Sequence, residues 1–209
     1  LPLGLRVMGS TLRGKREDDW ESLLHRLENS LDRKIKGVLR VGYDNLHKDD
    51  QLIFLLIAFF FNYEDDDYVM AMLSESNLDV RFGLKTLAYK SLIQKSTEGK
   101  IVMHKLLQQV GKEAIQLQEP TKRQIITDAQ DICDVLENDS VSRSVMGITF
   151  DISKIPHSIC ISAKALKRMP NLRFINIYKT RRDTNVRLHV PEDIYFPPSL
   201  RLLRWEVYP

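Results

Sequence analysis

The sequence lacks several features that would point to a particular class of protein. It has two cysteines, Cys133 and Cys160, which cannot build a disulfide framework and suit a reducing compartment. Its longest apolar run, residues 52–61, falls well short of the ~20 residues that a membrane span requires, so we expect a buried helix there. The chain begins with Leu1 rather than Met and shows no signal-peptide pattern, so we expect a fragment of a longer protein.

The sequence also has little excess of charge of either sign. A total of 31 basic and 28 acidic residues gives a formal net charge of +3. Proteins that bind nucleic acid usually cluster their basic charge, so this balance does not by itself indicate such a partner. With 209 residues, 43% of them hydrophobic and 28% charged, the chain has the composition of a soluble protein with a real core in one or two domains.

The stretch GSTLRGKR, residues 9–16, imitates a phosphate-binding loop but lacks one of its parts. Gly9, Gly14 and Lys15 fit the pattern G-x-x-x-x-G-K-[ST]. Arg16 stands where the motif needs a hydroxyl to ligate magnesium, and the preceding residues 1–8 make a poor strand. We therefore interpret the stretch as a glycine-containing loop before a helix.

Other enzyme and metal motifs are missing from the sequence. The acidic stretch NYEDDD, residues 62–67, has Asp67 where a calcium loop needs glycine and Leu73 where it needs glutamate. We expect these acids to cap a helix instead. The five histidines and two cysteines show no metal-ligand spacing, and no serine or cysteine lies in a nucleophile motif. We therefore expect no enzyme in this chain.

Apolar residues recur at helical spacing through the first half of the chain. Residues 18–31 and 35–46 each show one apolar face, and Asp49 and Asp50 are N-cap candidates for the apolar helix over 52–61. The other expected elements are helices over residues 68–73, 83–89, 106–118 and 128–137, and hairpin strands over residues 92–95 and 101–104. Three helices and a two-stranded wing predict a winged-helix domain that ends near Pro120.

Short strands dominate the sequence from residue 145 onward, and two of them repeat. Residues 172–177 read LRFINI and residues 200–205 read LRLLRW, which places equivalent apolar positions 28 residues apart. This spacing matches the L-x-x-L-x-L strand of leucine-rich repeats, whose period is about 20–29 residues, although one pair can also align by chance. Two units are too few to bury their own core, so we expect further repeats beyond Pro209.

Two candidate sites remain open from the residues alone. Arg81, Lys85, Lys90 and Lys95 could line the third helix and the wing of a DNA-binding winged helix, but the same segment is rich in leucine, which favours packing. His104, in MHKLLQQVG, lies where a predicted strand passes into a predicted helix. A side chain at such a junction can face a ligand, or it can be a structural residue.

Four segments, in order, resemble plant NB-ARC leucine-rich-repeat disease-resistance proteins that carry a TIR domain. LPLGLRVMGSTLRGK is similar to the GLPL motif, VGYDNLHKDDQLIFLLIAFFF to two ARC segments, MHKLLQQVGKEA to the MHD motif, and MPNLRFINIY with IYFPPSLRLLRWEVYP to the entry into the repeats. The resemblance runs almost end to end. It places GSTLRGK after the GLPL motif, and the true phosphate-binding loop is expected upstream of Leu1.

The resemblance implies a mainly α protein with a small β component, made of a helical bundle and a winged-helix domain followed by the start of an α/β leucine-rich-repeat solenoid. It divides the chain into four parts. These are the C-terminal part of the helical ARC1 subdomain (1–48), the winged-helix ARC2 subdomain with its MHD-like motif (49–120), a linker helix (121–144) and the N-terminal repeat region (145–209).

The resemblance also implies a ligand and the residues that hold it. Pro2, in the GLPL motif, is expected to pack near the adenine of bound ADP. His104, in the MHD motif, is expected to reach the ADP β-phosphate and to help hold the receptor closed. Lys105 replaces the aspartate of that motif, and we interpret it as a solvated surface residue. ADP or ATP is expected in the full-length protein, whereas this chain alone is not expected to bind nucleotide firmly.

The function implied is that of an intracellular plant immune receptor, cytoplasmic and with the nucleus as a second location. Such receptors exchange ADP for ATP on sensing a pathogen effector, then oligomerise so that their TIR domains cleave NAD+. The expected partners are an effector or a guarded host protein at the repeats and further copies of the receptor, with no membrane and no nucleic acid. The family's ATP and NAD+ sites are expected outside this chain, and the alternative is a winged-helix DNA-binding regulator.

Overall fold

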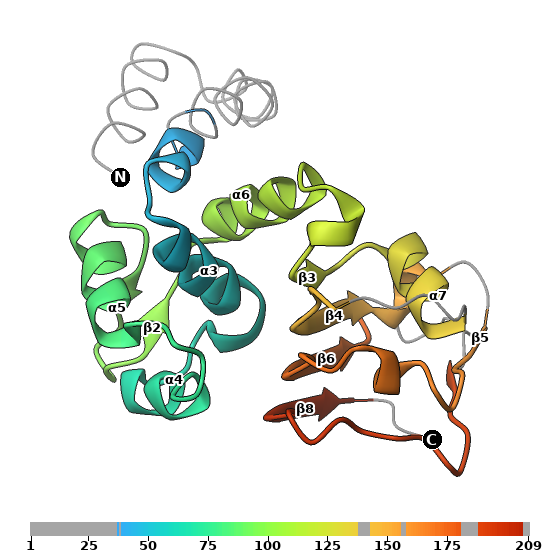
Figure 1. The fold of residues 1–209 in the computed structure, drawn as a ribbon. Coiled ribbons are helices and arrows are strands. Elements are labelled where there is room, and N and C mark those ends of the chain that lie inside the picture. Colours follow the sequence, from blue (N-terminus) through green and yellow to red (C-terminus); the bar gives the residue numbers. More distant parts are fainter. Residues whose placement is uncertain (1–36, 38, 138–142, 156–157, 181–187, 207–209) are drawn as a thin grey trace, which may run out of the picture.

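The computed structural model describes residues 37, 39–137, 143–155, 158–180 and 188–206. They form two parts that lie side by side, a helical part and a part built around stacked parallel strands (Figure 1). The predicted helix over 18–31, the loop at 9–16 and Pro2 lie outside the described residues. Of the predicted helix over 35–46, residues 39–44 are helical.

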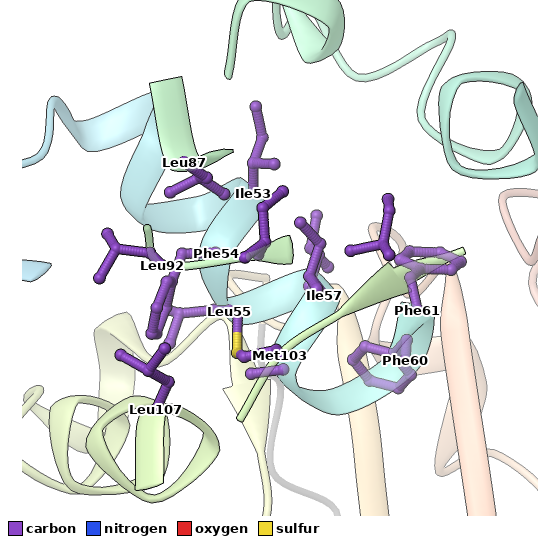
Figure 2. Packing of buried hydrophobic residues seen from close by; sticks show 14 of the residues in the cluster. Ile53, Phe54, Leu55, Ile57, Phe60, Phe61, Leu87, Leu92, Met103 and Leu107 are labelled. Carbon is purple, nitrogen blue, oxygen red and sulfur yellow. The ribbon is translucent and has the colours of Figure 1, made fainter. Parts of the chain in front are cut away.

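One apolar segment forms the centre of the helical part. Helix α3 (Lys48–Leu56) continues into the π-helical turn η1 (Ile57–Phe61), and every residue from 53 to 58 is buried. A segment that is apolar on all sides has to lie inside the fold. Figure 2 shows Leu87, Leu92 and Leu107, which come from other segments of the helical part, packed around it. The prediction of a buried apolar helix is therefore confirmed.

The start of this helix differs from the expectation. Its N-cap is His47, whose side chain accepts a hydrogen bond from the Asp49 backbone N–H, whereas Asp49 and Asp50 lie in the first turn. The carboxylates still suit the positive end of the helix dipole.

Within the described ranges, no helix combines the length and the apolar character that a bilayer crossing requires.

The rest of the helical part has the order that the sequence predicts for a winged helix. Its elements are α4 (Asp66–Met72), α5 (Val80–Tyr89), β1 (Gln94–Lys95), β2 (Ile101–Val102) and α6 (Lys105–Gln116). Strands β1 and β2 pair antiparallel, and the turn between them contains Gly99 at a φ of 81°, a conformation that glycine adopts without strain. The predicted hairpin and the helices beside it are confirmed.

The second part is built on a sheet of four parallel strands in the order β3-β4-β6-β8. A second parallel pair, β5 with β7, lies in the same part, and α7 packs on it. Its elements are η2 (Pro120–Lys122), β3 (Ile125–Ile126), α7 (Ala129–Glu137), β4 (Gly147–Asp151), η3 (Ile152–Lys154), β5 (Ile159–Cys160), η4 (Leu166–Arg168), β6 (Phe174–Tyr178), β7 (Leu188–His189) and β8 (Leu202–Trp205).

The register of this sheet agrees with the 28-residue spacing seen in the sequence. Ile175 pairs with Leu203 and Ile177 with Trp205, as the 28-residue spacing requires. Leu172 and Leu200, the first residues of the two matched segments, both pack in the core of the second part. The two matched segments therefore lie as neighbouring rungs of one sheet.

The segment 121–144, expected to be a linker helix, contributes more than a connection. It contains α7 within the predicted range 128–137, and also the unexpected strand β3, which pairs with β4. Ile132, Cys133 and Leu136 of α7 are buried in the core of the second part. The chain thus enters the sheet about 20 residues earlier than the sequence pattern indicated.

An aromatic cluster joins the two parts. Phe174 of β6 lies 5.5 Å from Phe60 and 5.4 Å from Phe61 between ring centroids. Gly147 of β4 lies against the Phe60 ring, so that a Cβ atom there would meet it at 2.7 Å. Arg204 of β8 donates to the Phe60 carbonyl at 3.2 Å and forms an ion pair with Glu64. The parts are packed together through a shared core, because Phe174 belongs to the core of the helical part.

A buried carboxylate ties the far end of the sheet together. Asp151, at the end of β4, accepts hydrogen bonds from the backbone N–H of Ser153 at 3.0 Å and of Thr180 at 3.1 Å, and from the Thr180 hydroxyl. Burial alone would raise the pKa of the Asp151 carboxyl, but these hydrogen bonds outweigh burial and lower its pKa below the usual value. The ionised form therefore links β4 to the segment that follows β6.

Candidate functional site

His104 is exposed and caps the N-terminus of α6. Its Nδ1 accepts a hydrogen bond from the Leu106 backbone N–H at 3.2 Å. In a neutral imidazole one ring nitrogen accepts and the other carries the proton, so this bond leaves Nε2 as the donor. An outward N–H donor beside the unpaired amides of a helix N-terminus is suited to an anionic oxygen.

The backbone just before His104 is held by a long-range side-chain contact. The Asn62 carbonyl oxygen accepts from the Met103 N–H at 2.8 Å, and the Asn62 amide donates to the Met103 carbonyl at 3.4 Å. The Met103 side chain is buried in the core, where Figure 2 shows it close to the α3 segment. Because successive residues of an extended segment point in opposite directions, anchoring Met103 inward keeps His104 outward.

The segment that carries Asn62 also extends the wing. Tyr63 N–H donates to the Ile101 carbonyl and Ile101 N–H donates to the Glu64 carbonyl, each at 2.8 Å. Tyr63 has a φ of 68°, which turns the chain sharply after η1. Residues 62–64 therefore brace both strand β2 and the junction at which His104 lies.

Known proteins that match the chain agree on one family. Residues 47–119 match the family described as the winged-helix domain of Roq1-like disease resistance proteins. Over its whole length the chain is 57% identical to the disease resistance protein RML1A, 54% identical to RML1B and 44% identical to RPS6, all from Arabidopsis thaliana. It spans 21%, 21% and 19% of those three proteins. The chain is a relative of plant disease resistance proteins.

The motif that resembles the MHD of these disease-resistance proteins can now be placed. His104 is the exposed N-cap of α6, and Lys105, the residue that replaces the aspartate, is the first residue of that helix and is exposed, as expected. A cation at this position is unfavourable to the helix dipole, where an aspartate would be favourable. Pro2, the other predicted contact, lies outside the described residues, so its contact with the nucleotide stays a prediction.

The basic residues considered for DNA lie among acidic residues. Arg81, Lys85 and Lys95 are exposed, but they line one shallow cavity of ≈ 310 Å³ together with Asp66 and Asp67. The Lys95 ammonium forms an ion pair with Asp66. The carboxylates interrupt the continuous positive surface that a DNA backbone prefers.

The acids of residues 62–67 lie at the start of α4, where Asp65 is the N-cap residue but its side chain makes no capping hydrogen bond. Asp66 and Asp67 occupy the first turn of α4, and Glu64 pairs with Arg204. Among the residues that the structure describes, no group of histidine, cysteine, aspartate and glutamate side chains has the arrangement to hold a metal ion.

Sequence reasoning located His104 but missed Asn62. The asparagine lies at the start of a stretch that local patterns assign to helix capping, and its partner Met103 is 41 residues away. The sequence signal for Asn62 is its position between the apolar run 52–61 and the acidic residues 64–67, because a polar side chain at such a boundary often hydrogen-bonds to backbone groups.

Proposed function

We propose that this chain is the regulatory segment of an intracellular plant immune receptor that is switched by exchange of ADP for ATP. The observation that carries the proposal is the exposed Nε2 donor of His104 at the N-terminus of α6, inside a Roq1-like winged-helix domain. The family resemblance supplies the ligand, and the geometry supplies a donor and a positive helix end that fit one of its phosphates.

His104 would hold the β-phosphate of ADP in the resting receptor. A hydrogen bond between an imidazole N–H and a charged phosphate is worth about 1.5–3 kcal/mol net. Losing it would shift the balance between closed and open receptors by roughly 10- to 150-fold, because ~1.4 kcal/mol is a factor of ten. Pro2 would pack near the adenine, and Asn62 would keep the His104 backbone in place.

The second part of the chain would begin the leucine-rich-repeat solenoid that senses an effector or a guarded host protein. Its support is the parallel register of β6 and β8, with Ile175 opposite Leu203. Leu203 is 44% exposed although Ile175 and Ile148 are each 2% exposed. The edge of a stacked array leaves such a residue exposed until the next unit covers it. Activation would then proceed by self-association, in the cytoplasm and also in the nucleus.

The test replaces His104 in the full-length receptor and scores cell death in leaves without an effector. We expect His104→Ala to cause effector-independent death at a protein level equal to that of the parent receptor, measured by immunoblot. His47→Ala is the matched control, because His47 is also an exposed helix N-cap that accepts from a backbone N–H through Nδ1, at 3.5 Å. It should remain quiet.

A second variant separates the cap from the ligand contact. His104→Asn keeps an oxygen that can cap α6, so it should preserve the roughly 0.5–2 kcal/mol that an N-cap contributes, but it lacks the imidazole donor. We expect it to be active without effector, like His104→Ala. If His104→Ala and His104→Asn are both silent, His104 has no part in the switch. Death from His47→Ala as well would mean that domain destabilisation, and not a lost phosphate contact, causes the response.

A further inference from the structure

A cavity of ≈ 340 Å³ opens at the N-terminal ends of the strands of the second part. Gln124 directly precedes β3, Met146 precedes β4 and Arg173 precedes β6, and all three line it. The volume lies at the lower end of the ~300–1,000 Å³ typical of small-molecule sites and far above that of a single water. His104 is at the other end of α6, a helix of 12 residues and so about 18 Å long.

Positive charge dominates the lining of this cavity. Lys122, Arg143 and Arg173 contribute three cations, and among the described residues that line it none is acidic. Lys122 has an exposed partner, Glu119, at 2.7 Å. This differs from the cavity beside α5, where lysine and arginine alternate with Asp66 and Asp67. Apart from the Lys122–Glu119 pair, the lining presents cations without carboxylates, which favours an anionic ligand.

One guanidinium nitrogen in the cavity wall is buried without a partner. Arg173 Nη1 is inaccessible to solvent and makes no hydrogen bond within the structure. A buried donor on a charged group is costly to leave unpaired, and the planar guanidinium matches two oxygens of a phosphate at once. Because this nitrogen is closed to solvent, the guanidinium has to turn toward the cavity before a ligand can reach it, and a ligand bound there would then satisfy the orphan donor.

The rim of the cavity is fixed by hydrogen bonds that do not use the cations. The Ser144 hydroxyl donates to the Thr121 carbonyl at 2.9 Å, and the Asn171 amide donates to the Arg143 carbonyl at 2.8 Å. The backbone N–H of Arg173 donates to the Met146 carbonyl at 2.8 Å. The backbone that carries the three cations is thus already ordered, which lowers the entropy cost of binding.

We propose that this cavity binds a phosphoryl group of a small phosphorylated molecule, held in a bidentate contact by Arg173 and neutralised by Lys122 and Arg143. The site is separate from the nucleotide contact proposed for His104, and neither depends on the other. Inorganic pyrophosphate is a probe of the shared chemistry, and ADP tests whether a nucleotide is the source of the phosphate.

The experiment measures pyrophosphate binding to the 209-residue chain by calorimetry and by thermal shift, with sodium chloride at equal ionic strength as the reference. We expect a saturable heat and a rise in Tm that chloride does not reproduce. R173M should raise the Kd at least tenfold, R173K should give an intermediate Kd because it keeps the charge but not the fork, and R143M should weaken binding severalfold. K90M is the matched control and should leave the Kd unchanged, because Lys90 is an exposed cation at the C-cap of α5 and does not line the cavity.

Stability in phosphate-free buffer provides a second measurement. R173M should melt no lower than the parent chain, because it removes an unpaired buried donor and keeps the apolar stem. Absence of saturable pyrophosphate binding by the parent chain overturns the proposal, as does an equal loss in K90M, which would indicate general charge attraction. Pyrophosphate binding that H104A abolishes and R173M does not would assign the phosphate to His104 and would also overturn it.

Discussion

Replacing Gly147 by alanine tests the packing between the helical part and the sheet. A Cβ atom built on Gly147 lies 2.7 Å from Cζ and 2.8 Å from Cε2 of Phe60. Carbon atoms in contact prefer about 3.5–4.0 Å, so the ring must move by roughly 1 Å. The ring has little room, because Phe60 is 2% exposed and its centroid lies 5.5 Å from that of Phe174 and 6.4 Å from that of Phe61.

The expected cost is that of overpacking a tight core, about 1–3 kcal/mol. For a chain of this size each kcal/mol lowers the Tm by about 2–4 °C. Gly147→Ala should therefore melt several degrees below the parent chain and should lower the urea midpoint with an unchanged slope. Gly37→Ala is the control, since Gly37 is helical and its added Cβ meets nothing within 4 Å. It should gain roughly 0.5–1 kcal/mol from helix propensity.

A shortened partner should relieve the clash. Phe60→Leu removes the two ring atoms that the new Cβ would meet, so the double variant should be more stable than the sum of the single effects, by about 0.5–3 kcal/mol. If Gly147→Ala is as stable as the parent chain, Gly147 does not lie against the Phe60 ring in solution. Strict additivity of the two changes would lead to the same conclusion.

Two further predictions concern ionisable groups of the second part. Because the pKa of Asp151 is lowered in the folded chain, its stabilising effect is present above the unfolded pKa of ~3.9 and is lost as the pH falls through the folded pKa. The Tm difference between the parent chain and Asp151→Asn should thus shrink between pH 5 and pH 2, and a constant difference would contradict this. Burial, together with the charges of Glu137 and Asp134, raises the pKa of the Cys133 thiol, whereas Cys160 is exposed. In the native chain, one thiol should therefore react rapidly with a disulfide reagent, and in urea both should. A thiol that still reacts rapidly in the native Cys160→Ser variant would contradict this.

The winged-helix part could be predicted closely because its signals are local. The helix predicted over 106–118 is observed as α6, and the hairpin strands flank Gly99 as its turn requires. His47 was missed as the cap of α3 because histidine is not among the favoured N-cap residues, while two aspartates follow it at once. Residue preferences favoured Asp49 or Asp50 as the cap, whereas in the structure the helix begins at Lys48 and His47 caps it.

The early part of the sheet could not be predicted for a different reason. Strand β3 consists of Ile125 and Ile126 alone, too short for any alternation to be seen. Its place is fixed by strand β4, which begins at Gly147, and by the Gln124 carbonyl, which accepts from the Gly147 N–H at 3.1 Å. Pairing between residues this far apart leaves no mark in a single sequence, whereas the repeat of β6 and β8 does.

The candidate site shows the same division between local and distant signals. His104 stood out because a strand-to-helix junction is visible in the sequence, and the MHD resemblance named it. Arg173 did not, because its orphan nitrogen arises only when the segments before β3, β4 and β6 are brought to one edge. Sequence patterns identify residues whose role is set by their neighbours in the chain, and they miss residues whose role is set by neighbours in space.

Residues 60–64 show where the two parts and the histidine meet. Arg204 of β8 donates to the Phe60 carbonyl and forms an ion pair with the Glu64 carboxylate, so β8 cannot move away from residues 60–64 without losing both contacts. Asn62 lies between those two residues and holds the Met103 backbone beside His104. The contacts that hold β8 and the contact that positions the histidine therefore fall on one short segment, residues 60–64. This connection depends on partners 41 and 140 residues apart in the chain, which is why the acidic turn reads in sequence as no more than a helix cap.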